Sequence, residues 1–109
     1  MSDVLNQLSP RSVWGHFASL AAIPRPSGKE ERAVGFVSAV GESIGVKPVT
    51  DARGNVVLRV PATKGREGAK TVILQTHLDM ECQKNRGVAH DFVRDPIPPR
   101  LDGGSVTPS

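Results

Sequence analysis

The chain has 109 residues, of which 38% are hydrophobic and 23% charged, a balance typical of a globular domain and not of a disordered segment. Its formal net charge is +3, but the basic residues are dispersed among acidic ones and aromatic residues make up only 4%. This composition disfavours a nucleic-acid binder, which needs a basic patch and, for single strands, aromatic stacking platforms.

Two amphipathic helices are predicted in the first half of the chain. Ser9 followed by Pro10 is a typical helix start, and apolar residues then recur at spacings of three and four until a stiff connector with two prolines. Ser27 and Glu30 have capping-box spacing, which predicts the start of a second helix. Gly45 lies where a left-handed C-cap glycine is expected to end that helix.

Strands are predicted next. The segments 46–50 and 55–60 are expected to pair around a turn at 51–54. Residues 71–76 form a continuous, mostly apolar run, which indicates a strand buried on both faces of an α/β layer structure. Residues 87–109 contain four prolines and three glycines without a regular apolar pattern. We therefore expect one domain portion over 1–109, ordered over 1–86 and ending in a loop-rich tail over 87–109.

His77 and Asp79 directly follow the predicted buried strand. Residues i and i+2 of an extended segment project to the same side, so both can face a crevice at the strand's carboxyl end. A neutral imidazole is a good zinc ligand, and a carboxylate on its other ring nitrogen would fix the tautomer. The alternative is a polar strand end with a chance ion pair. A zinc site needs at least three protein ligands; His16 is expected to pack on the first helix, and His90-Asp91 lies in the tail.

The sequence around His77 and Asp79 resembles that of one enzyme family. The string 72–80, followed by Gln83-Lys84-Asn85 and by His90-Asp91-Phe92, is similar to the aminoacyl-histidine dipeptidases, also called Xaa-His or cytosol non-specific dipeptidases. These belong to a larger family of di-zinc metallopeptidases. The earlier motifs at 23–28 and at Gly54-Asn55 resemble the same family, and the resemblance covers essentially all 109 residues in order. It implies the N-terminal portion of a zinc-peptidase-like α/β catalytic domain, with helices packed on a mixed sheet that is incomplete here.

The resemblance also implies an activity, which is zinc-dependent hydrolysis of Xaa-His dipeptides with two zinc ions in the full-length protein. It makes His77 a zinc ligand and places Asp79 in the catalytic machinery, where it steers that histidine. The bridging aspartate, the general-base glutamate and the other ligands would follow residue 109. Glu81, Asp91 and Asp95 match no ligand position. We therefore expect at most one partial zinc site, no other cofactor, and an inactive 109-residue chain.

Partners and location follow from the same features. We expect a dipeptide substrate, no nucleic acid and no membrane, and the family leaves room for a homodimer of the full-length protein. The single cysteine, Cys82, and the lack of a leader-like or bilayer-spanning apolar run predict a cytoplasmic protein. The alternative function is a short non-catalytic binding or regulatory module that pairs with a full-length relative through its exposed sheet edge.

Overall fold

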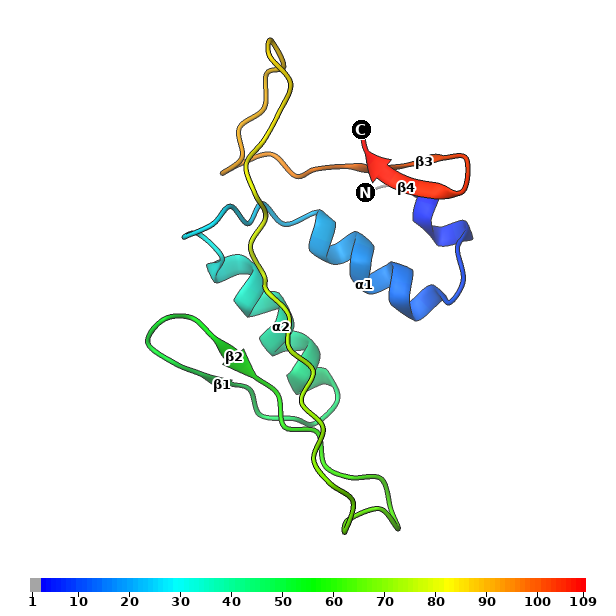
Figure 1. Ribbon diagram of the computed structural model, residues 1–109, viewed down its shortest axis with the longest axis vertical. Helices are drawn as coiled ribbons and strands as arrows, with labels where there is room; N and C mark the ends of the chain where they lie inside the picture. Colours follow the sequence, from blue (N-terminus) through cyan, green and yellow to red (C-terminus); the bar gives the residue numbers. More distant parts are fainter. Residues whose placement is uncertain (1–2) are drawn as a thin grey trace.

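The computed structural model describes residues 3–109 of the chain (Figure 1). Its elements in chain order are η1 (Asp3–Gln7), α1 (Arg11–Ala21), α2 (Glu31–Ser43), β1 (Val49–Thr50), β2 (Val56–Val57), β3 (Pro99–Asp102) and β4 (Ser105–Pro108). The strands form two separate antiparallel pairs, β1 with β2 and β3 with β4. Helices together with small sheets confirm the α/β class. The larger mixed sheet is not formed within residues 3–109.

Helix α1 begins one residue later than the sequence predicts. Pro10 has φ −74° and ψ 141°, an extended conformation, so Pro10 occupies the N-cap position and Arg11 is the first helical residue. The expectation that Ser9 caps the helix is therefore wrong, since the cap position makes no side-chain hydrogen bond. The helix ends at Ala21, before the proline-containing connector to α2.

Helix α2 ends at Ser43, and Gly45 is the left-handed glycine that the sequence predicts just after the helix end. The backbone N–H of Val46 donates to the carbonyl of Gly41 at 2.9 Å, and that of Gly45 donates to Glu42 at 3.0 Å. Gly45 has φ +77°, and these two bonds form a Schellman motif that satisfies carbonyls left free by the helix end. Val46 is buried beside this turn, so the helix end is tied to the small core.

The start of α2 differs from the prediction. Glu30 occupies the N-cap position without a side-chain cap, and its carboxylate accepts a hydrogen bond from the backbone N–H of Gly28 at 2.6 Å. Ser27 does not cap the helix because its hydroxyl donates to Asp79, 52 residues further along the chain. The predicted capping box is therefore replaced by a long-range contact.

The β1–β2 hairpin forms where it is predicted, although its strands are shorter. Asp51 organises the turn, because its Oδ1 accepts the backbone N–H groups of Arg53 at 2.9 Å and Asn55 at 3.0 Å. Its Oδ2 accepts the side-chain amide of Asn55 at 2.8 Å. Gly54 completes the turn with φ +88°, a conformation that favours glycine. The hydrogen bonds from Asn55, the side-chain one foremost, lower the pKa of Asp51.

This turn should weaken in acid. A carboxyl whose folded pKa is depressed stabilises the fold above its unfolded pKa of about 3.9, and the contribution is lost as the pH falls through the folded pKa. Carbon-detected NMR titration should place Asp51 below that ordinary value, and Asn55→Ala should move its pKa back upward. A wild-type Asp51 that titrates at or above the ordinary value would contradict this assignment.

The segment 71–76 is extended but is not the buried strand that its sequence predicts. Val72, Ile73 and Leu74 are 78%, 85% and 94% exposed, and no strand within residues 3–109 pairs with this segment. A strand buried on both faces needs neighbouring strands and covering helices, and the described residues supply neither. The segment belongs to the yellow-green trace that rises from the lowest loop of the molecule (Figure 1). The exposed fractions show that its apolar side chains are uncovered.

The tail also departs from the prediction. Residues 99–108 form the β3–β4 hairpin, in which Leu101 lies opposite Val106, so the expectation of a loop-rich segment holds only outside these strands. The hairpin lies against η1, whose Leu5 is 1% exposed, which brings the two ends of the chain together (Figure 1). This contact between distant segments leaves no periodic signal in the sequence.

The apolar core is small. The buried hydrophobic residues in the part of the chain that the structure describes are Leu5, Ala18, Ala33 and Val46. The accessible surface is 8892 Å², against about 5,800 Å² for a compact monomer of this mass. The radius of gyration is 16.5 Å, against about 13 Å for a compact domain of this length. None of the helices within residues 3–109 is long and apolar enough to cross a bilayer.

Candidate metal-ligand site

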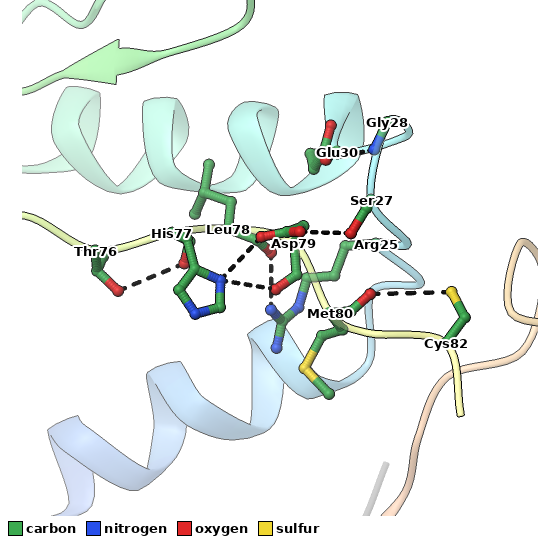
Figure 2. A network of polar contacts seen from close by, with 10 residues as sticks. All are labelled: Arg25, Ser27, Gly28, Glu30, Thr76, His77, Leu78, Asp79, Met80 and Cys82. Carbon is green, nitrogen blue, oxygen red and sulfur yellow. Dashed lines mark hydrogen bonds and ion pairs between the residues drawn. The ribbon is translucent and has the colours of Figure 1, made fainter. Parts of the chain in front are cut away.

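The extended segment ends in a contact between His77 and Asp79. The Nδ1 atom of His77 lies 2.9 Å from Oδ1 of Asp79 and 3.0 Å from the backbone oxygen of the same residue (Figure 2). A backbone carbonyl and an ionised carboxylate only accept hydrogen bonds, so this network assigns the proton to Nδ1. The lone pair of the neutral ring then lies on Nε2. The side chain of His77 is 84% exposed, so it is open to an incoming metal ion.

The second carboxylate oxygen of Asp79 has its own partner. The hydroxyl of Ser27 donates to Oδ2 at 2.5 Å (Figure 2). The hydrogen bond from Ser27, followed by that from His77, lowers the pKa of Asp79. At neutral pH the side chain is therefore an ionised acceptor with one partner on each oxygen.

The connector before α2 also holds the backbone around this pair. The guanidinium of Arg25 donates to the carbonyl of Leu78 at 2.8 Å, and the backbone N–H of Met80 donates to the carbonyl of Arg25 at 2.8 Å. Pro26 and Met80 form an isolated parallel bridge. Burial lowers the pKa of Arg25 and the charge of Asp79 opposes that shift, so the guanidinium remains a cationic donor.

The sequence predicted the pair but not these supports. Ser27 has capping-box spacing with Glu30, and this local pattern concealed its contact with a residue 52 positions away. Arg25 lies 53 positions from Leu78, a separation that no helical or strand period reports. The one available signal was that the sequence motifs at 23–28 and at 72–80 both resemble the same family.

The remaining candidate residues do not join the site. His16 lies edge-on to the ring of Phe36 on α2 at 6.4 Å between centroids, and His90 lies edge-on to Phe92 at 4.7 Å. Within residues 3–109, no group of three or more His, Cys, Asp or Glu side chains could hold a metal ion. Among the described residues, His77 therefore stands as a single potential ligand with an oriented ring.

The three acids that match no ligand position have local partners. Glu81 accepts the side-chain amide of Gln83 at 2.7 Å. Asp91 accepts the backbone N–H of Val93 at 3.0 Å, and Asp95 accepts the backbone N–H of Asp91 at 2.8 Å. These bonds organise exposed turns and bring no carboxylate to His77.

Comparison with known proteins gives two strong matches. No family model matches the chain. It is 44% identical over 99 residues to the cytosol non-specific dipeptidase of Escherichia coli (strain K12), a match that covers 91% of this chain and 20% of that protein. It also superposes on the crystal structure of the aminoacylhistidine dipeptidase from Vibrio alginolyticus with a TM-score of 0.90 and 39% identity. That match covers 100% of this chain and 23% of the other.

Both of these proteins are named as dipeptidases, so the class of protein that this chain resembles in sequence and in structure is a peptide-bond hydrolase. The chain is similar to one part of an aminoacyl-histidine or cytosol non-specific dipeptidase, and the predicted resemblance is confirmed. The chain spans 20% of the length of the E. coli protein and 23% of the length of the V. alginolyticus chain.

Proposed function

We propose that these residues serve a zinc-dependent dipeptidase of the Xaa-His type, in which His77 is a metal ligand and Asp79 orients it. The observation that carries the proposal is the 2.9 Å contact between Nδ1 of His77 and Oδ1 of Asp79. It holds the ring through one nitrogen and leaves the lone pair of Nε2 to bind a metal ion. Carboxylate–histidine pairs of this kind are the usual support of a metal-binding imidazole.

The residues fit one corner of a zinc site. His77 offers an imidazole nitrogen, a preferred zinc ligand, and its exposure of 84% allows other ligands to approach. Zinc, when bound, lowers the pKa of a coordinated water towards ~7 and polarises a carbonyl. The task of this chain's own residues is to fix the imidazole plane and its tautomer and to keep the Asp79 carboxylate ionised beside it.

The 109-residue chain by itself should not turn over substrate. A catalytic zinc site needs three protein ligands, and no three potential ligands lie together among the described residues. The purified chain with zinc and alanyl-histidine should show no hydrolysis above buffer. Turnover that His77→Ala abolishes would contradict this expectation and show that the chain completes a site by itself.

We further propose a cytoplasmic location and a dipeptide as the binding partner, with neither nucleic acid nor membrane. The curated relative carries the word cytosol in its name, and Cys82 is exposed and free, which suits a reducing compartment. A homodimer of the complete protein belongs to the same proposal.

A second candidate function rests on the exposed segment 71–76. Its uncovered apolar side chains and unpaired backbone could add a strand to a full-length dipeptidase, which would make the chain a non-catalytic module. Light scattering of the chain mixed with the E. coli relative tests this idea. A complex that Ile73→Lys removes and Val60→Lys, at another exposed apolar position, leaves intact would support the module; no complex would dismiss it.

A further inference from the structure

We propose that Ser27 is a positioning residue, whose hydroxyl holds the carboxylate of Asp79 in the orientation that receives the Nδ1–H of His77. The geometric inference is independent of activity, but its consequence, presentation of Nε2 to a metal ion, rests on the proposed function. No local motif contains this residue pair, since Ser27 and Asp79 are 52 positions apart.

The need for such a support follows from the exposure of the pair. The side chain of Asp79 is 38% exposed and that of His77 is 84% exposed, so neither is held by burial. The terminal torsion of an aspartate is broad, and a carboxylate held at one oxygen keeps much of its rotational freedom. With Ser27 on Oδ2 and His77 on Oδ1, both oxygens are occupied and the carboxylate plane is set.

Ser27 can impose this orientation because its own backbone is restrained. Pro26 fixes its own φ and restricts the preceding residue, and its carbonyl accepts the backbone N–H of Lys29 at 2.9 Å, which closes a turn around Ser27. Gly28 has φ +88° within this turn. The hydroxyl therefore projects from a fixed loop, as Figure 2 shows for Ser27 beside Asp79.

Arg25 has a different task in the same connector. Its guanidinium holds the carbonyl of Leu78, between the two site residues, and its own carbonyl holds the N–H of Met80. Arg25 thus fixes the path of the backbone, whereas Ser27 fixes a side chain. Removal of the Ser27 hydroxyl should release the carboxylate while the backbone stays in place.

The test is the tautomer of His77, read from the 15N shifts of its two ring nitrogens in the histidine-labelled 109-residue chain at neutral pH and low temperature. The wild type should carry the proton on Nδ1. Ser27→Ala should lower the ratio of the Nδ1–H to the Nε2–H tautomer by about 3- to 10-fold, the size expected for loss of one hydrogen bond. Ser27→Thr, which keeps a hydroxyl, should restore the ratio.

Two controls separate positioning from general damage. Ser12→Ala, at an exposed position of α1, should leave the ratio unchanged, and backbone amide spectra should report an intact β1–β2 hairpin in every variant. In an Asp79→Ala background, Ser27→Ala should have no further effect, because the hydroxyl acts only through that carboxylate.

The inference is overturned if Ser27→Ala behaves like Ser12→Ala, if Thr fails to restore the ratio, or if the effect persists without Asp79. The measurement needs neither metal nor turnover. A failure of the dipeptidase proposal would therefore leave this result standing, and a negative tautomer result would leave the dipeptidase proposal open to its own test.

Discussion

When the 99 aligned residues of the E. coli dipeptidase are replaced by those of this chain, we expect an active dipeptidase that His77→Ala inactivates. The 44% identity and the TM-score of 0.90 with a related structure indicate that the inserted residues can adopt the family conformation. Loss of a direct ligand should cost more than the roughly 10- to 100-fold that follows removal of an outer-shell partner. Asp79→Ala should fall within that smaller range, because the imidazole remains but its orientation is lost.

The measurement is kcat/KM for alanyl-histidine, with zinc content per molecule determined on the same samples. His16→Ala is the matched control, because that ring packs against Phe36 and belongs to no ligand group in residues 3–109. If His77→Ala kept both its zinc and its activity, the proposed ligand role would be wrong.

We expect the isolated chain to be only marginally stable and to show no cooperative thermal transition above ~60 °C. For comparison, typical mesophilic domains unfold at about 45–65 °C. Its buried apolar residues are few, and its surface of 8892 Å² exceeds that of a compact monomer by about half. Stability arises chiefly from apolar burial that offsets chain entropy, and this chain buries little. Three consecutive exposed residues, Val72, Ile73 and Leu74, also favour aggregation of the free chain.

Circular dichroism and calorimetry of the dilute monomer test this prediction. Ile73→Lys, which places a charge in the uncovered segment, should reduce aggregation and leave the unfolding temperature nearly unchanged, because the side chain is 85% exposed. A sharp calorimetric transition above ~60 °C would show that the chain is a self-sufficient domain and would contradict the structural argument.

Local features of this fold were predictable from local sequence. Gly45 and Gly54 mark a helix end and a turn because each needs a positive φ, and both have it. The contact between His77 and Asp79 follows from the two-residue period of an extended chain. Each of these inferences depends on residues that are neighbours in the sequence.

Long-range features were not predictable in this way. The apolar run at 71–76 predicts burial, but burial depends on other segments that lie beside it, and residues 3–109 supply none. The proline-containing segment 99–108 forms a hairpin that packs on η1, at the other end of the chain. Ser27 matches a local capping pattern, yet its hydroxyl is used 52 residues away. In each case the deciding partner is distant in sequence.

Nε2 of His77 is the atom that we propose as a metal ligand, with Nδ1 of the same ring held by Asp79. Loading the chimeric dipeptidase with cadmium-113 and labelling its histidines with 15N allows this atom to be observed directly. We predict a one-bond cadmium–nitrogen coupling to Nε2 of His77 and a proton on Nδ1. A coupling to Nδ1, or no coupling to His77 in a metal-loaded active enzyme, would contradict the account.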